Sequence, residues 1–244
     1  MKDGDFRGAA AHFAQAIKQG GGTAEAHLDL GSALEAGELP EEALEQYAAS
    51  FDAEPSIEAA VAASYAARAM SHRREAVAWL ERGLNVDPES AFVRRRIADL
   101  HLESHDFSKA AEAAREAIRF AADDADMQIW ASEVLLDSGR AEEALKAAQV
   151  AQSIKPLSAE PLVQQALSLA CLGRLPEAVR QLNLARDVEP QNGFIGLLIS
   201  VFDPEQQSDK AESFDAIHLL RLIDRPGMPD PVLSEARRLA ASSE

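Results

Sequence analysis

Apolar side chains recur three or four residues apart along most of the chain, which is the spacing of amphipathic helices. Short turn signals interrupt this pattern, such as Ser138-Gly139-Arg140 and Leu172-Gly173-Arg174. Aromatic residues make up only 5% of the chain, while alanine and leucine occur in almost every segment. This composition favours closely packed helices over an aromatic-rich sheet core. The pattern therefore predicts an all-α protein built from helical hairpins.

A repeat organises these helical segments. One alanine position recurs at spacings of 33, 34, 34 and 34 residues, at Ala43, Ala76, Ala110, Ala144 and Ala178. A second small position recurs in the same phase, at Gly31, Ser64, Ala98, Ser132 and Ala166. Small side chains at both positions allow two helices to approach closely, so each repeat is predicted to be one hairpin. Prolines that should end the second helix follow at Pro55, Pro88, Pro156 and Pro190.

This period resembles the tetratricopeptide repeat, and the segment from Ala24 to Tyr47, AEAHLDLGSALEAGELPEEALEQY, matches the pattern of that family closely. The resemblance covers roughly residues 4–200. It implies a right-handed α-α superhelix in which stacked hairpins bury one another's apolar faces. Residues 1–22 would form a half repeat with only a second helix, residues 23–192 five consecutive repeats, and residues 193–244 a degenerate repeat with C-terminal capping helices.

Both ends depart from the repeat. In the first segment the apolar face of Phe6, Ala9, Phe13 and Ile17 lacks a partner helix, which predicts either an upstream extension missing from this chain or a self-association surface. A monomer at high concentration, unchanged by Phe13→Asp, would reject self-association.

At the other end, the helix from Phe194 to Phe202 is expected to stop at Asp203-Pro204. A capping helix is predicted over residues 209–223, with Asp209 and Glu212 as its start signal. Its predicted inner face consists of Ala211, Phe214, Ile217 and Leu220. A Pro/Gly loop over residues 225–231 then leads to a short charged helix that ends near Ala241.

The resemblance also implies a binding groove, because the first helices of such repeats line a concave surface and usually contact ligands from fixed positions. The corresponding residues here are Glu25, Leu28, Ser32, Glu58, Val61, Tyr65, Arg68, Phe92, Arg95, Asp99, Asp126, Ile129, Glu133, Glu160, Val163 and Leu167. Tyr65, Phe92, Ile129 and Leu167 would form an apolar track flanked by acidic residues. Such a groove would suit a protein or peptide with apolar anchors and basic residues. The alternative is that these charges are an ordinary solvated face.

Some relatives hold a partner's C-terminal carboxylate with lysine, arginine and asparagine at set groove positions. The matching asparagine positions here are Ser32, Tyr65 and Asp99. The sequence therefore does not reproduce the carboxylate clamp of chaperone-binding members.

The net charge of -17 argues against nucleic acid or an anionic membrane surface as a partner. The longest apolar run, Phe194 to Phe202, is far shorter than the roughly 20 residues of a membrane-spanning helix. The one cysteine, Cys171, cannot form an internal disulfide. We therefore expect a cytoplasmic protein, unless the chain is a piece from which a leader or anchor is missing.

No motif for nucleophilic catalysis or phosphate binding is present, so we expect no enzyme and no cofactor. His101 and His105 share one helical face, but a metal site there is disfavoured because His101 falls at a packing position of the repeat. The cluster Arg94-Arg95-Arg96 is interpreted as a partner for nearby acids, with an anion contact through Arg95 as the alternative.

The sequence thus predicts a protein-binding scaffold. Two alternatives remain at this point: the regulatory or substrate-recruiting arm of a larger enzyme or export machine, and a self-assembling array. The fold alone does not choose among them.

Overall fold

The computed structural model describes residues 6–203, 205 and 216–241. These residues form α-helices and no strand, which confirms the predicted all-α class. The helices are α1 (Phe6–Ala16), α2 (Ala24–Ala36), α3 (Pro40–Ala53), α4 (Ile57–Ala69), α5 (Arg73–Val86), α6 (Ala91–Glu103), α7 (Phe107–Phe120), α8 (Ala125–Asp137), α9 (Ala141–Ile154), α10 (Glu160–Cys171), α11 (Leu175–Val188), α12 (Gly193–Phe202), α13 (Ala216–Ile223) and α14 (Asp230–Ala241). A π-helical turn, Ile17–Gly21, follows α1.

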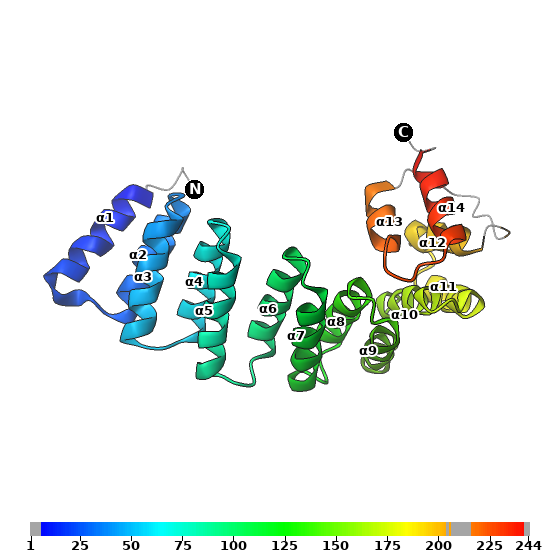
Figure 1. Cartoon of the computed structure of the whole chain (residues 1–244), viewed down its shortest axis with the longest axis horizontal. Coiled ribbons are helices and arrows are strands. Elements are labelled where there is room, and N and C mark those ends of the chain that lie inside the picture. Colours follow the sequence, from blue (N-terminus) through cyan, green and yellow to red (C-terminus); the bar gives the residue numbers. More distant parts are fainter. Residues whose placement is uncertain (1–5, 204, 206–215, 242–244) are drawn as a thin grey trace. The chain divides into compact units, whose positions relative to one another are not determined.

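The chain divides into two compact units, residues 1–105 and residues 106–244. In the first unit α2 pairs with α3 and α4 pairs with α5, while α1 packs on α2, α3 on α4 and α5 on α6 (Figure 1). In the second unit α8 pairs with α9 and α10 pairs with α11, while α7 packs on α8, α9 on α10 and α11 on α12. The hairpins α2–α3, α4–α5, α8–α9 and α10–α11 are thus present as predicted, whereas α6 and α7, which were predicted to form the third repeat, fall in different units.

Side-chain caps fix where several first helices begin. The hydroxyl oxygens of Thr23, Ser56 and Ser90 accept hydrogen bonds from backbone N–H groups of Ala26, Ala59 and Val93, over 3.2, 3.2 and 3.4 Å. These bonds satisfy amides that have no partner inside the helix. Three repeats therefore start their first helix in the same way.

The turn inside each hairpin places one residue in the left-handed region. In the second unit this residue is Gly139 or Gly173, with φ of 70° and 74°. In the first unit the same repeat position holds Glu38, Ser71 and His105, with φ of 60°, 64° and 55°. Glycine adopts this conformation freely, whereas other residues are strained there. The Gly-Arg turn signals in the sequence therefore mark a backbone requirement of the hairpin.

The small repeat positions lie at the closest helix contacts, as predicted. Ala43, Ala76, Ala110, Ala144 and Ala178 are all 0% exposed. A Cβ atom added to Gly31 would lie 2.5 Å from the ring of Tyr47, so only glycine fits there. Ser132 is fully buried and donates its hydroxyl to the Ala144 carbonyl over 3.0 Å, which joins the two helices of its hairpin.

Both tryptophans are largely buried among the helices. Trp79 and Trp130 are each 8% exposed, and the ring of Trp79 meets Phe51 edge-on at 5.9 Å. The guanidinium of Arg82 lies 4.1 Å from the Trp79 ring centroid and pairs with Asp52 at 2.9 Å. These side chains stabilise the second helices of the first unit.

At the first end of the chain, α1 ends in the glycine segment, where Gly20 has φ of 94°. Phe6 is 45% exposed and Phe13 and Ile17 are partly buried, so the apolar face of α1 is only partly covered by α2. Self-association through this face stays a prediction.

The last repeat of the second unit is covered by the C-terminal helices. One apolar core joins Leu182 and Leu198 to Leu219 and Ile223 of α13 and to Val232 of α14. The predicted inner face of the capping helix was wrong at Ile217, which is 70% exposed, because Leu219 and Ile223 point inward instead, both 0% exposed. Leu220 is partly buried against the same core, as predicted, and Asp209, Ala211, Glu212 and Phe214 lie outside the described residues.

None of the described helices has the length and apolar character that crossing a bilayer requires.

Candidate functional site

The candidate site is a pocket between α4 and α6 in the first unit. It encloses about 170 Å³ and is lined by Ser64, Tyr65, Arg68, Leu80, Arg96, Asp99, Leu100 and Glu103. A second, more open hollow of about 530 Å³ adjoins it and is lined by Glu35, Tyr65, Arg68, Ala69, Arg73 and Glu103. Three residues of the predicted groove therefore come together here: Tyr65, Arg68 and Asp99.

The first helices of the hairpins position these side chains. Tyr65 and Arg68 are one turn apart on α4, and Asp99 and Glu103 are one turn apart on α6. Because α5 packs both on α4 and on α6 and contributes Leu80 to the lining, three consecutive helices form the pocket. The pocket is thus a consequence of the repeat itself.

An arginine–carboxylate fork spans the pocket. Arg68 donates from Nε to Glu103 Oε2 over 3.0 Å and approaches Glu103 Oε1 with Nη2 at 2.6 Å. This hydrogen bonding raises the pKa of Arg68, so the guanidinium stays charged. Arg96 pairs with Asp99 at 3.3 Å and lies over the exposed ring of Phe92, 5.1 Å from its centroid. Charged groups of both signs therefore line the pocket, and they are paired with one another.

A buried tyrosine anchors one wall of the open hollow. Tyr47 is 1% exposed and donates its hydroxyl to Glu35 Oε2 over 2.7 Å. Burial is the main cause of the raised pKa of Tyr47, and its hydrogen bond to Glu35 adds to it. The phenol therefore stays protonated, and the bond holds the Glu35 carboxylate at the edge of the hollow.

The remaining predicted residues of the first unit are distributed unevenly. Glu25, Ser32, Glu58 and Phe92 are exposed, whereas Leu28 and Arg95 are partly buried. Val61 is only 9% exposed and belongs to the helix packing rather than to an open groove. The face that remains accessible is therefore mainly polar, with Tyr65 and Phe92 as its large apolar members.

In the second unit the predicted apolar track was wrong. Ile129 is 4% exposed and Leu167 is 0% exposed, so neither side chain can receive a ligand. Both lie in apolar cores, and that of Leu167 also contains Met228 from the C-terminal segment. The C-terminal segment thus contributes to the burial of Leu167, whereas Ile129 packs with Ala125 and Ala151.

The acidic positions of the second unit have partners within the chain. Asp126 pairs with Lys155, and Glu133 accepts a hydrogen bond from Gln164 Nε2 over 2.9 Å. Glu160 is exposed and Val163 is partly buried. These residues offer a less open surface than the pocket of the first unit.

Sequence reasoning missed Arg96, Glu103 and Arg73 as pocket residues. Glu103 lies one turn beyond Asp99, the last residue of its helix in the predicted groove, and Arg96 was considered only as part of a basic cluster. The signal that could have found Glu103 is its repeat partner Asp137, an acid 34 residues later. Among the described residues no three His, Cys, Asp or Glu side chains are grouped so that they could hold a metal ion.

Cys171 is a partly buried thiol at the end of α10. Burial raises the pKa of this thiol to about 11, an effect that Arg225 opposes and Asp137 adds to. We expect its alkylation by iodoacetamide to keep accelerating up to pH of about 11, because only the thiolate reacts. Rates measured across this range, with the urea-unfolded chain as control, check this. A plateau near pH 9.0 in the folded chain would contradict it.

A sequence model of the tetratricopeptide repeat matches residues 1–51 and 95–159. Solved structures share the fold, among them YrrB, described as a TPR protein with an unusual peptide-binding site, at a TM-score of 0.59 and 18% identity over 77% of this chain and 97% of that one. A MamA structure matches at 0.58 and 19% identity, over 70% of this chain and 94% of that one. MamA from Desulfovibrio magneticus RS-1 matches at a TM-score of 0.55 and 16% identity, over 69% of this chain and 96% of that one. No curated protein matches the chain.

The stacked hairpins and their small contact positions define a helical-repeat protein. Together with the repeat model that matches residues 1–51 and 95–159, they show that the chain carries tetratricopeptide repeats.

Proposed function

We propose that the chain binds a protein or peptide segment on the face formed by the first helices of the first unit, with the α4–α6 pocket at its centre. The observation that carries this proposal is the pocket between Tyr65, Arg68 and Asp99, because it joins an accessible aromatic ring to charged groups of both signs. A peptide-binding site is also printed for YrrB, which shares the fold. Tetratricopeptide-repeat proteins generally mediate protein–protein interactions.

The charge of this face favours a partner with basic and apolar residues. The first helices of this unit carry six acidic side chains and four arginines, and one further arginine, Arg73, lines the hollow. The acids are Glu25, Asp29, Glu35, Glu58, Asp99 and Glu103, and the arginines of the helices are Arg68, Arg94, Arg95 and Arg96. Two of these arginines are already paired with Glu103 and Asp99. The acidic excess would attract lysine or arginine, and Tyr65 and Phe92 would contact apolar side chains of the partner.

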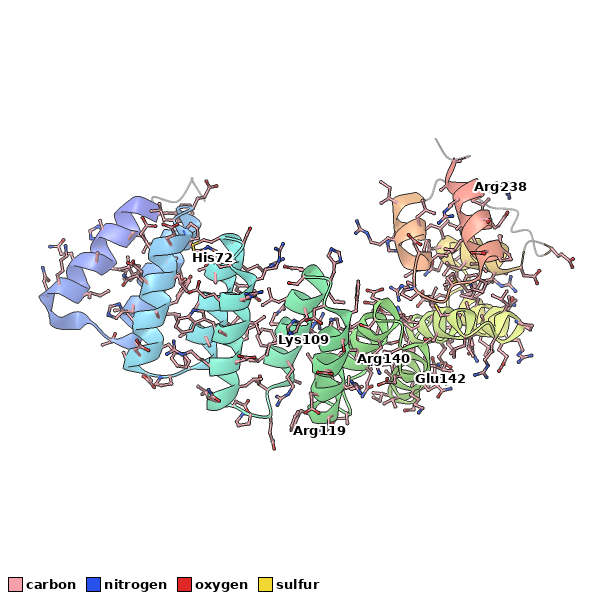
Figure 2. The ribbon with its side chains drawn as sticks, viewed as in Figure 1. His72, Lys109, Arg119, Arg140, Glu142 and Arg238 are labelled. Carbon is pink, nitrogen blue, oxygen red and sulfur yellow. The ribbon has the colours of Figure 1, made fainter. Side chains whose placement is uncertain are left out.

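The proposal is tested by capture from the native lysate with wild-type protein beside a Tyr65→Ala/Arg68→Ala variant. Arg238→Ala serves as control, because Arg238 lies on α14, pairs with Glu235 and is 65% exposed (Figure 2). All three proteins must first show equal helicity by circular dichroism.

A partner retained by wild type and control but lost by the pocket variant, with affinity reduced at least about tenfold, is the expected result. Raised ionic strength should weaken its association, because the attraction is electrostatic. Identical captures by all three proteins would overturn the proposal.

A further inference from the structure

The loop between α13 and α14 lies on the C-terminal ends of α8 and α10. A Cβ atom added to Gly227 would stand 2.8 Å from the carbonyl oxygen of Cys171, and one added to Gly139 would stand 3.5 Å from Pro226. Gly227 has φ of 86°, a conformation that glycine adopts without strain. Met228 follows and is 6% exposed in the shared apolar core. The loop therefore packs directly against the end of α10 and beside the turn that follows α8.

Arg225, which belongs to this loop, lies beside the C-terminal end of α8. Its side chain is only 8% exposed, and its Nε lies 3.4 Å from Oδ1 of Asp137, the last residue of α8. The Nε and Nη1 atoms are buried and have no hydrogen-bond partner. A cation is favoured at a helix C-terminus, but a buried guanidinium with unused donors is costly. Arg225 thus occupies the space beside Asp137, but two of its buried donor atoms remain without a hydrogen bond.

Comparison of equivalent repeat positions explains why an arginine lies beside Asp137. Asp137 follows Glu103 by 34 residues and so occupies the same position of its helix. Glu103 receives the full fork of Arg68, with contacts of 3.0 and 2.6 Å. The residue of the next repeat that corresponds to Arg68 is Leu102, which carries no charge. The acid at Asp137 therefore has no arginine from the preceding repeat helix, and Arg225 comes from a distant loop.

We propose that Asp137 and the C-terminal ends of α8 and α10 form a second binding site, for a peptide segment with an arginine followed within three residues by methionine or another unbranched apolar residue. The segment Arg225-Pro-Gly-Met228 occupies this site in cis. A partner arginine that donates a complete fork to Asp137 competes with it, because charge-assisted forks are stronger than the single long contact of Arg225. This site is separate from the pocket of the proposed function and does not depend on it.

Cys171 reports on the state of the site in the full chain, because it is the one cysteine and the loop contacts its carbonyl. The rate of its alkylation by iodoacetamide at pH 8 is compared between wild type and Arg225→Ala. Arg238→Ala is the matched control, since it removes the same charge from the exposed side of α14. We expect alkylation about tenfold faster in Arg225→Ala and unchanged in the control, because more frequent opening of the loop exposes the thiol and outweighs the loss of the Arg225 charge, which lowers the pKa of Cys171. Should Arg225→Ala lose helicity, Arg225→Lys keeps the charge without the fork and should give a smaller increase.

The second arm adds a synthetic peptide of residues 222–230 to the Arg225→Ala chain. This variant is used because the wild-type loop competes at an effective concentration in the millimolar range. We expect the peptide to slow alkylation of Cys171 back toward the wild-type rate at submillimolar concentration. The same peptide with alanine in place of the arginine should have no effect.

The outcomes separate clearly. Equal alkylation of wild type and Arg225→Ala would overturn the arginine site. Faster alkylation in the variant without protection by the peptide would show that the loop is only a structural cap, and would overturn binding in trans. Protection by both peptides alike would overturn the selectivity for arginine.

Discussion

Gly31→Ala should lower the free energy of unfolding of the first unit by about 1–3 kcal/mol, the usual cost of overpacking a core. Alanine is normally the better residue inside a helix by about 1 kcal/mol, so intrinsic propensity predicts the opposite sign. The contact decides, because the new Cβ atom would lie 2.5 and 2.6 Å from two carbons of the Tyr47 ring. Tyr47 is fully buried and held by Glu35, so its ring has little room to move.

Urea unfolding followed by circular dichroism measures this change. Gly193→Ala is the matched control, because nothing lies within 4 Å of a Cβ atom added there. We expect the control to change the free energy of unfolding by no more than about 0.5 kcal/mol. Equal stability of both variants would mean that the first hairpin tolerates a wider separation of its helices.

Leu167→Ala should cost about 2–5 kcal/mol in the second unit, the range for a leucine removed from a close-packed core. The side chain is 0% exposed and lies in the core that joins α10 to the C-terminal helices. This prediction separates the two interpretations of Leu167, since a groove residue would affect binding and leave stability almost unchanged.

Leu157→Ala provides the comparison, because Leu157 is 87% exposed between α9 and α10. Its free energy of unfolding should stay within about 0.5 kcal/mol of wild type. A Leu167→Ala variant as stable as Leu157→Ala would place Leu167 on an open surface and reject the packing described for the second unit.

The sequence predicted the hairpins because their determinants are local. Small residues recur where helices touch, and apolar residues recur at helical spacing; both are properties of neighbouring positions. The turn glycines Gly139 and Gly173 follow the same logic, since only the local backbone conformation requires them. Tyr65, Arg68 and Asp99 could be placed on one face for the same reason, because equivalent positions of stacked repeats lie side by side.

Other features depended on contacts between distant segments. The pattern could not show that Leu167 is covered, because the residues that share its core, such as Met228, come from beyond the repeats. Nor could it show that Ile217 points outward while Leu219 points inward, since both choices leave an amphipathic helix.

By itself the sequence determined the all-α class, the repeat and the residues at each helix contact, because the same residue types recur at equivalent positions of every repeat. Only the tertiary structure decided which part of the predicted groove is open, which carboxylate forms the ion pair with Arg68 and where the side chain of Arg225 is buried. Those outcomes depend on side chains that meet across long stretches of chain, and their free energies come from burial and pairing that no local pattern records.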